Sequence, residues 1–125
     1  IGVREGIDRV QWNPTALNWM SMRDLSDWLH YGPVDPGLPQ EISVGEADAS
    51  RLRRRIASAG LDIDISRDAG THVCNLVLFH GLVHAPVGVR FFFVHVPPEI
   101  LRDPGLRRSL EGLVELFVMA GSHGP

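Results

Sequence analysis

The sequence predicts an α/β domain with a mostly parallel central sheet and helices on both of its faces. Three observations support this class. Helical and strand-like segments alternate along the chain after residue 45. Residues 61–66 alternate apolar and polar side chains, as a strand with one solvent-facing side does. Residues 89–96 are β-branched or aromatic almost throughout, which is typical of a central strand covered on both faces.

The individual elements follow from periodicity and from the glycines and prolines between the segments. The first 45 residues give little periodicity: Ile1–Val3 fits the end of a strand, and Gly32–Pro39, rich in proline and glycine, fits a loop. The later segments are clearer, because helix formers and strand formers are separated by glycine or proline. In chain order we expect a helix at 46–59, a strand at 61–66, a helix at 72–84, a strand at 89–96 and a helix at 106–120.

Length and composition restrict the class of protein. The 125 residues, 44% of them hydrophobic, suffice for one domain with a core, so we expect a single domain over 1–125. Twelve basic against fifteen acidic residues give no basic footprint for nucleic acid. One cysteine excludes an internal disulfide and a cysteine zinc cage. No apolar run approaches the roughly 18 residues of a membrane span, and no signal peptide pattern is present, so we expect a cytoplasmic protein without membrane contact.

Cys74 and His95 are the candidate catalytic pair. If the strands at 61–66 and 89–96 are parallel neighbours, Cys74 and His95 follow or end them at the same sheet edge, where sites of open parallel sheets form. Cys74 also falls in the first turn of a predicted helix, where free N–H groups and the macrodipole favour a thiolate and an oxyanion. The alternative is a buried cysteine that fills the core and a histidine that caps a strand.

Two segments resemble the signatures of pyroglutamyl-peptidase I, a family of cysteine peptidases that remove N-terminal pyroglutamate from peptides. They are Ser66–Asn75 (Ser-Arg-Asp-Ala-Gly-Thr-His-Val-Cys-Asn) and Phe93–Pro98 (Phe-Val-His-Val-Pro-Pro). The resemblance implies a phosphorylase/hydrolase-like fold, Cys74 as the nucleophile, His95 as the base and Val73 at the substrate. It also implies a reaction without a cofactor or metal, and relatives that assemble as homo-oligomers.

The resemblance is thinner upstream. The family's catalytic glutamate is replaced by Asn13, and Arg23 falls where members carry an arginine near the oxyanion. We expect the Asn13 side-chain oxygen to accept a hydrogen bond from His95, because papain-like enzymes also combine cysteine, histidine and asparagine. The family's N-terminal strands and its pocket-forming loop have no counterpart, so the chain corresponds to the C-terminal portion of the fold. Two functions stay open: a thiol peptidase, or a catalytically impaired binding or scaffold module.

His80 and His84 form a second pattern, because a spacing of four places them on one helix face, as in zinc-binding helices. The glutamate of the usual His-Glu-x-x-His motif is absent, since Gly81 follows His80. We therefore expect two histidines near the solvent rather than a metal site.

Overall fold

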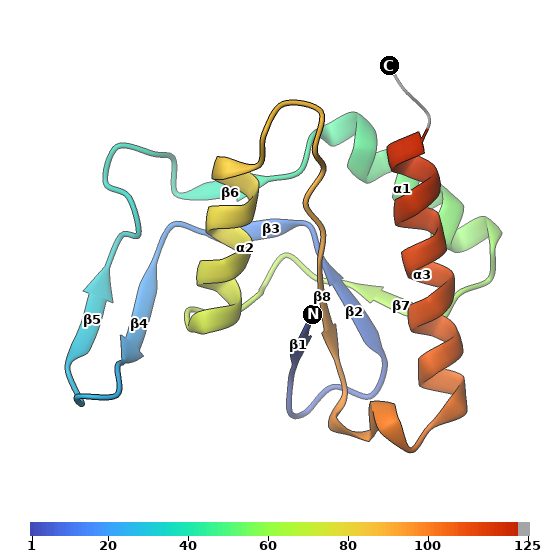
Figure 1. Ribbon diagram of the computed structural model, residues 1–125, viewed down its shortest axis with the longest axis horizontal. Helices are drawn as coiled ribbons and strands as arrows, with labels where there is room; N and C mark the ends of the chain where they lie inside the picture. Colours follow the sequence, from blue (N-terminus) through green and yellow to red (C-terminus); the bar gives the residue numbers. More distant parts are fainter. Residues whose placement is uncertain (123–125) are drawn as a thin grey trace.

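The computed structural model of the chain describes residues 1–122 and confirms the α/β class (Figure 1). All three expected helices form within a few residues of their predicted ends. They are α1 (Glu46–Ser58), α2 (Val73–His84) and α3 (Pro104–Ser122), and a short 3-10 helix, η1 (Pro98–Leu101), precedes α3. The strands within residues 1–122 are β1 (Gly2–Val3), β2 (Val10–Asn13), β3 (Thr15–Leu17), β4 (Met20–Arg23), β5 (Leu29–Gly32), β6 (Glu41–Ser43), β7 (Ile63–Ile65) and β8 (Phe93–Val96).

The central sheet has the strand order β1-β8-β2-β7. β1 runs parallel to β8 and β2 parallel to β7, whereas β2 and β8 are antiparallel. Parallel pairings therefore predominate, as expected.

The expectation that 61–66 and 89–96 form neighbouring parallel strands is wrong. β2 lies between β7 and β8, and because it is parallel to one and antiparallel to the other, β7 and β8 run in opposite directions. The sequence analysis did not assign residues 10–13 to a strand, although apolar Val10 and Trp12 alternate there with polar Gln11 and Asn13. The expected strand at 89–96 also shortens to its last four residues.

Side-chain alternation gives the sheet two different faces. One face carries apolar residues of β2 and β8 and packs against α1 and α3. Its buried members are Val10, Trp12, Val94 and Val96 from the sheet, Leu52 and Ile56 from α1, and Leu113 from α3. On the other face Phe93 packs against Leu78 and Phe79 of α2. Helices therefore cover both faces, and Figure 1 shows α2 and α3 flanking β2 and β8.

The helix ends follow local chemistry. α1 buries Leu52 and Ile56, which are four residues apart on one side of the helix. It ends just before Gly60, which has a φ of +65°, a conformation that glycine adopts without strain.

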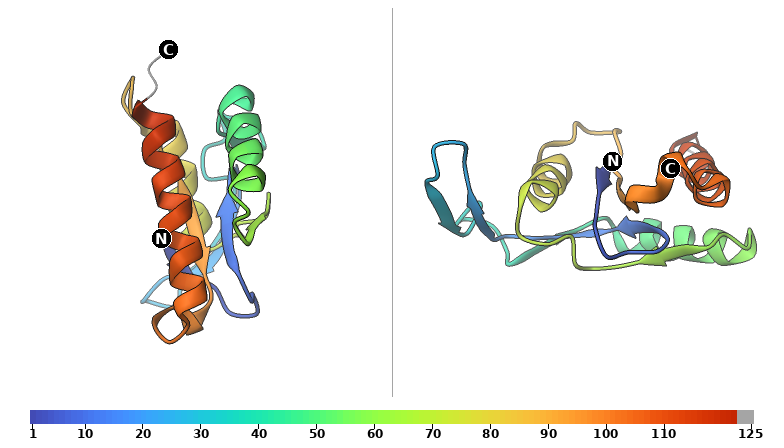
Figure 2. Two further views of the ribbon diagram at one scale, coloured as in Figure 1. Left: turned by 90° about the vertical axis from the view of Figure 1, so that its right-hand side faces the viewer. Right: turned by 90° about the horizontal axis from the view of Figure 1, so that it is seen from below.

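Residues 14–45, in which the sequence predicts only the loop at 32–39, form two small antiparallel pairs, β3 with β6 and β4 with β5. The β4–β5 hairpin extends away from the helices at one end of the molecule, opposite α1 (Figure 2). Trp19 and Tyr31 pack edge to face across it, with ring centroids 5.0 Å apart. The hairpin therefore carries aromatic side chains that the central core does not enclose.

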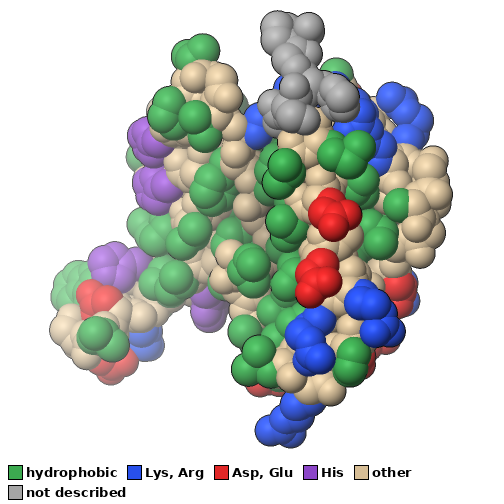
Figure 3. Space-filling model, turned by 45° about the vertical axis from the view of Figure 1, so that its right-hand side comes forward, with side chains coloured by type: hydrophobic (Ala, Val, Ile, Leu, Met, Phe, Trp, Pro, Cys, Tyr) green, Lys and Arg blue, Asp and Glu red, His purple; other side chains and the backbone are tan. Residues whose placement is uncertain are grey.

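The surface around α3 mixes charged and apolar side chains (Figure 3). Val114 and Val118 of α3 are exposed, as are Val3 of β1 and Val77 of α2. Among residues 1–122, no helix combines the length and the apolar character needed to cross a membrane.

Candidate active site

Cys74 lies in the first turn of α2, as predicted, and its side chain is partly exposed. Leu76 is the first residue of the helix to donate back along it, to the carbonyl oxygen of His72 at 3.1 Å. The N–H groups of Val73, Cys74 and Asn75 consequently have no acceptor within the helix. This end of α2 thus presents hydrogen-bond donors beside the thiol.

Gly2 of β1 is the point where the thiol and the imidazole meet. A Cβ atom placed on Gly2 would lie 2.7 Å from Cys74 Sγ and 3.4 Å from His95 Cδ2. Sγ and Cδ2 therefore cannot be farther apart than these two distances combined. Only a residue without a side chain leaves room for both groups here.

The route that brings Cys74 to His95 differs from the predicted one. Since β7 and β8 run in opposite directions, their carboxyl ends lie at opposite edges of the sheet. The segment 66–72 instead crosses β2, because the carbonyl oxygens of Ser66 and Asp68 accept from the Asn13 side chain. Figure 1 shows the N-terminal end of α2 facing β1 and β8 after this crossing. The loop, and not the direction of the strands, places the thiol.

Asn13 binds the imidazole as the sequence analysis expected. Asn13 Oδ1 lies 2.6 Å from His95 Nδ1, and both side chains are buried, with exposed fractions of 0% and 2%. The two N–H groups of the Asn13 amide are shared among three acceptor oxygens, those of the Gln11 side chain at 3.1 Å and of the Ser66 and Asp68 carbonyls. This orientation leaves only the Asn13 oxygen for His95, so Nδ1 carries the hydrogen and Nε2 keeps its lone pair in the neutral ring.

A row of polar residues crosses the sheet in register with His95. His95 pairs with Gly2 on one side and with Gln11 on the other, and Gln11 pairs with Asp64 of β7. Gln11 Nε2 donates to Asp64 Oδ2 at 3.3 Å, while Gln11 Oε1 accepts from Asn13 and from Arg4 Nη1. Arg4 and Gln11 were not among the site residues predicted from the sequence. Their two-residue spacing from Gly2 and Asn13 places them on the same sheet face and was the available signal.

The electrostatic setting favours a neutral imidazole. Burial is the largest cause and the positive charge of Arg4 the next, and with the opposing effect of Asp68 included the pKa of His95 is lowered to about 4. Asn13 contributes no charge at Nδ1. A proton on the imidazole is therefore unfavourable in the resting site.

An open cavity of about 330 Å³ gives access to this pair. It is lined by residues 3–5, by residues 69–74 and by His95. Val73, predicted to contact substrate, lines the cavity and is 56% exposed. Arg23 lies elsewhere, on the β4–β5 hairpin, where its Nη1 donates to the Asp27 carbonyl oxygen at 3.0 Å. The catalytic and substrate-binding roles of these residues stay predictions.

The side chain of Asn75, the residue after Cys74, binds the backbone at the end of β3. Its side-chain oxygen accepts from the Leu17 N–H at 2.9 Å, and its nitrogen donates to the carbonyl oxygens of Leu17 and Trp19. These bonds attach the first turn of α2 to the end of β3. Asn75 therefore fixes the helix that carries the thiol.

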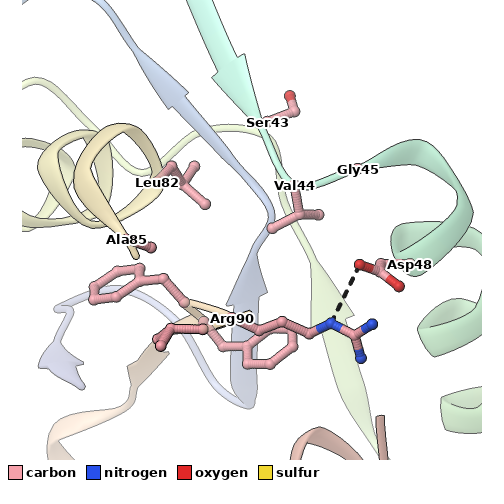
Figure 4. Close-up of a pocket in the computed structure, with 10 residues that line it drawn as sticks. Ser43, Val44, Gly45, Asp48, Leu82, Ala85 and Arg90 are labelled. Atoms are coloured by element: carbon pink, nitrogen blue, oxygen red, sulfur yellow. Dashed lines mark ion pairs between the residues drawn. The ribbon is translucent and has the colours of Figure 1, made fainter. Parts of the chain in front are cut away.

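A second cavity of about 190 Å³ lies between the start of α1 and the end of α2 (Figure 4). Arg90 crosses it to pair with Asp48 at 3.6 Å, and the remaining lining side chains are mostly apolar. Neither Cys74 nor His95 lines it. It is separate from the candidate catalytic groups.

His80 and His84 stack on one another, with ring centroids 5.5 Å apart. Within residues 1–122, no group of three or more histidine, cysteine or acidic side chains is arranged to hold a metal ion.

A thiol at a helix N-terminus, beside a histidine oriented by an amide, is an arrangement that thiol hydrolases use for nucleophilic attack. Comparison with known proteins narrows this class. The family model described as pyroglutamyl peptidase matches residues 35–106, and the chain belongs to that family.

Individual relatives agree with this assignment. The chain is 44% identical over 70 residues to the pyrrolidone-carboxylate peptidase of Cupriavidus pinatubonensis, a match covering 49% of this chain and 32% of that protein. It is 36% identical over 85 residues to the enzyme of the same name from Gloeobacter violaceus, covering 63% of this chain and 40% of that one. The chain thus spans 32% to 40% of the length of these relatives.

Solved structures show the same fold. The crystal structure of pyrrolidone carboxyl peptidase from Thermus thermophilus superposes with a TM-score of 0.70 at 22% identity, covering 91% of this chain and 66% of that one. A mutant of the enzyme from Pyrococcus furiosus superposes with a TM-score of 0.67 at 19% identity, covering 94% of this chain and 66% of that one. The predicted resemblance and fold class are both confirmed.

Proposed function

We propose that this chain carries the catalytic groups of a cysteine peptidase that removes pyroglutamate from the N-terminus of peptides. The main support is that Cys74 Sγ and the His95 ring both lie close to the position that a Cβ atom on Gly2 would occupy. The chain is also a member of the pyroglutamyl peptidase family. The open cavity beside this pair gives a peptide access to the thiol.

The proposed reaction begins with the neutral imidazole. His95 Nε2 takes the thiol proton as Cys74 Sγ attacks the carbonyl carbon of the pyroglutamyl residue. The oxyanion that forms is stabilised by the free N–H groups of the first turn of α2. His95 then returns the proton to the leaving amine, the C–N bond breaks, and water hydrolyses the thioester to free pyroglutamate and the thiol.

Asn13 takes the third position of this triad in place of the family's glutamate. Its oxygen holds Nδ1–H, so Nε2 is available as the base. An amide gives the imidazolium less stabilisation than a carboxylate, and a carboxylate-to-amide change cost about 10⁴-fold in a serine protease where the wrong tautomer resulted. Here the three acceptors around the Asn13 nitrogen favour the productive tautomer, so we expect a smaller loss.

Substrate contacts, assembly and location are further parts of the proposal. Val73 contacts the pyroglutamyl ring from the cavity wall. The role of Arg23 near the oxyanion is implied by the resemblance alone, because Arg23 does not line the cavity. Homo-oligomers form, as the resemblance implies. The reaction takes place in the cytoplasm, where a lone thiol stays reduced.

A pyroglutamyl-linked fluorogenic amide tests the activity. We expect the chain to release the fluorophore, iodoacetamide to abolish the release, and Cys74→Ala and His95→Gln to lower kcat/KM by about 10³-fold or more. His84→Gln is the matched control, because it removes an exposed histidine of α2 and leaves the site intact.

One combination of results would contradict the peptidase proposal. If the folded chain releases no fluorophore, and Cys74 reacts with iodoacetamide only as slowly as an ordinary thiol, the peptidase proposal fails. The impaired binding or scaffold module would then be the better account of the chain.

A further inference from the structure

We infer that Arg4 is a positioning residue whose charge keeps the imidazole of His95 in the neutral form that accepts a proton from Cys74. The inference rests on the proposed function for its catalytic meaning, although its physical content concerns the protonation of His95 alone. Three features of the structure support it: the face on which Arg4 lies, the bonds that hold it, and the charges around the imidazole.

The backbone places Arg4 on the side of the sheet that carries the catalytic pair. Gly2 is in register with His95, and the Arg4 N–H donates to the Val96 carbonyl oxygen at 3.0 Å, so the β1–β8 pairing continues to Arg4. Side chains two residues apart on a strand point to the same face. Arg4 therefore follows Gly2 on that face, and it lines the same cavity as Cys74 and His95.

Two hydrogen bonds hold the guanidinium in this place. Arg4 Nη1 donates to Gln11 Oε1 at 3.0 Å and to the Asp68 carbonyl oxygen at 2.6 Å. Gln11 is itself fixed by Asp64 and Asn13. The Arg4 side chain is 29% exposed, so its charge is only partly screened by water. Arg4 is thus a charge fixed beside the site, unlike a mobile surface arginine.

The charged groups around His95 are few. Arg4 is a positive group and Asp68 a negative one, with the Asp68 carboxylate 4.0 Å from Arg4 Nη2. The thiol of Cys74 lies near the ring, and Glu5 and His72 also line the cavity. At Nδ1 the partner is the neutral Asn13 amide.

This balance disfavours the imidazolium. Burial is the largest cause that lowers the pKa of His95, and Arg4 is the next. With no carboxylate at Nδ1 to offset these two effects, the ring stays neutral at physiological pH and ready to take the thiol proton. Arg4 thereby extends to lower pH the range in which Nε2 can act as the base.

The test compares Arg4→Gln, which removes the charge, with Arg4→Lys, which keeps a charge, and with Arg9→Gln. Arg9 is the matched control, because it pairs with Asp8 and Asp62 and does not line the cavity. The first readout is the titration of the His95 ring by NMR, assigned by its absence in His95→Gln. The second readout is the rate of Cys74 alkylation by iodoacetamide as a function of pH.

We expect Arg4→Gln to raise the midpoint of the His95 titration by about half a pH unit or more, since a nearby like charge disfavours the protonated ring. The acid limb of kcat/KM against pH should move upward by the same amount. Arg4→Lys should restore most of the original midpoint, and Arg9→Gln should leave it unchanged. An unchanged midpoint in folded Arg4→Gln, or an equal shift in Arg9→Gln, overturns the inference.

Asp68→Asn provides a second variant should Arg4→Gln fail to fold. It removes the opposing negative charge but keeps a side-chain oxygen for the bond from the Gly70 N–H. Its His95 midpoint should fall, in the direction opposite to that of Arg4→Gln, and a midpoint that stays or rises counts against the inference. Because the NMR readout needs no substrate, a chain without peptidase activity but with these shifts would refute the proposed function and leave the role of Arg4 intact.

Discussion

The Gly2→Ala variant tests the geometry of the site most directly. The added methyl group would lie 2.7 Å from Cys74 Sγ and 3.1 Å from Phe93 Cζ, and both distances are shorter than ordinary van der Waals contacts. Cys74 has a single side-chain torsion and sits in a helix that Asn75 fixes to β3, so relief requires the sulfur to turn away or β1 to shift. Either movement separates the thiol from His95.

The expected magnitudes follow from this crowding. Overpacking of this kind costs about 1–3 kcal/mol of unfolding free energy. A displacement of about 1 Å at the nucleophile lowers catalysis by about 100-fold, and this loss should appear mainly in kcat. The assays are urea unfolding and hydrolysis of the pyroglutamyl fluorogenic amide.

Gly45→Ala is the control for this variant. Gly45 precedes α1 with a φ of −54°, and a Cβ there would meet nothing within 4 Å. We expect less than about 1 kcal/mol of destabilisation and unchanged hydrolysis. If Gly2→Ala folds and hydrolyses its substrate at the rate of the parent chain, the argument that Gly2 makes room for the thiol and the imidazole is refuted.

Three further predictions concern the triad, the core and the dependence on pH. Asn13→Ala leaves His95 Nδ1 without its partner and should lower kcat/KM by about 10²- to 10⁴-fold; unchanged hydrolysis would remove Asn13 from the mechanism. Leu113→Ala opens a cavity in the buried core and should lower the free energy of unfolding by about 2–5 kcal/mol, measured with urea. Val118→Ala, at an exposed position, should lower it by less than about 0.5 kcal/mol. Equal losses would contradict the assigned core. Because the pKa of His95 lies near 4 in the folded chain and near 6.5 in the unfolded one, its contribution to stability is complete above about pH 6.5 and is lost as the pH falls toward 4. His95→Gln should flatten that part of the stability curve, and a curve of unchanged slope would show that the ring titrates normally.

The core elements were readable in the sequence because local patterns specify them. Helix α1 has two buried residues four apart and a glycine with positive φ just past its end, and β8 is apolar except for His95 and is followed by two prolines. The first 45 residues were harder, because strands of two to four residues carry too little periodicity to be distinguished from loops. The structure shows that β2, within this part, is a central strand of the sheet.

For the site, too, local sequence patterns identified the residues but not the way in which the fold brings them together. The residues around Cys74 and His95 resemble a family signature, which pointed to the pair without any knowledge of strand direction. The geometric reason first considered for their meeting, two parallel neighbouring strands, is wrong, since β2 separates β7 from β8.

The sequence by itself determined the α/β class, the three helices and the family, because each depends on residues close together in the chain or on a short motif. The resemblance also predicted Asn13 as the hydrogen-bond partner of His95, although the two residues lie 82 positions apart. Only the tertiary structure decided the strand order, the crossing of residues 66–72 over β2 and the placement of Arg4 and Gln11 around the imidazole. These features depend on pairings between segments more than 90 residues apart, such as Gly2 with His95. Local sequence patterns do not specify such long-range pairings.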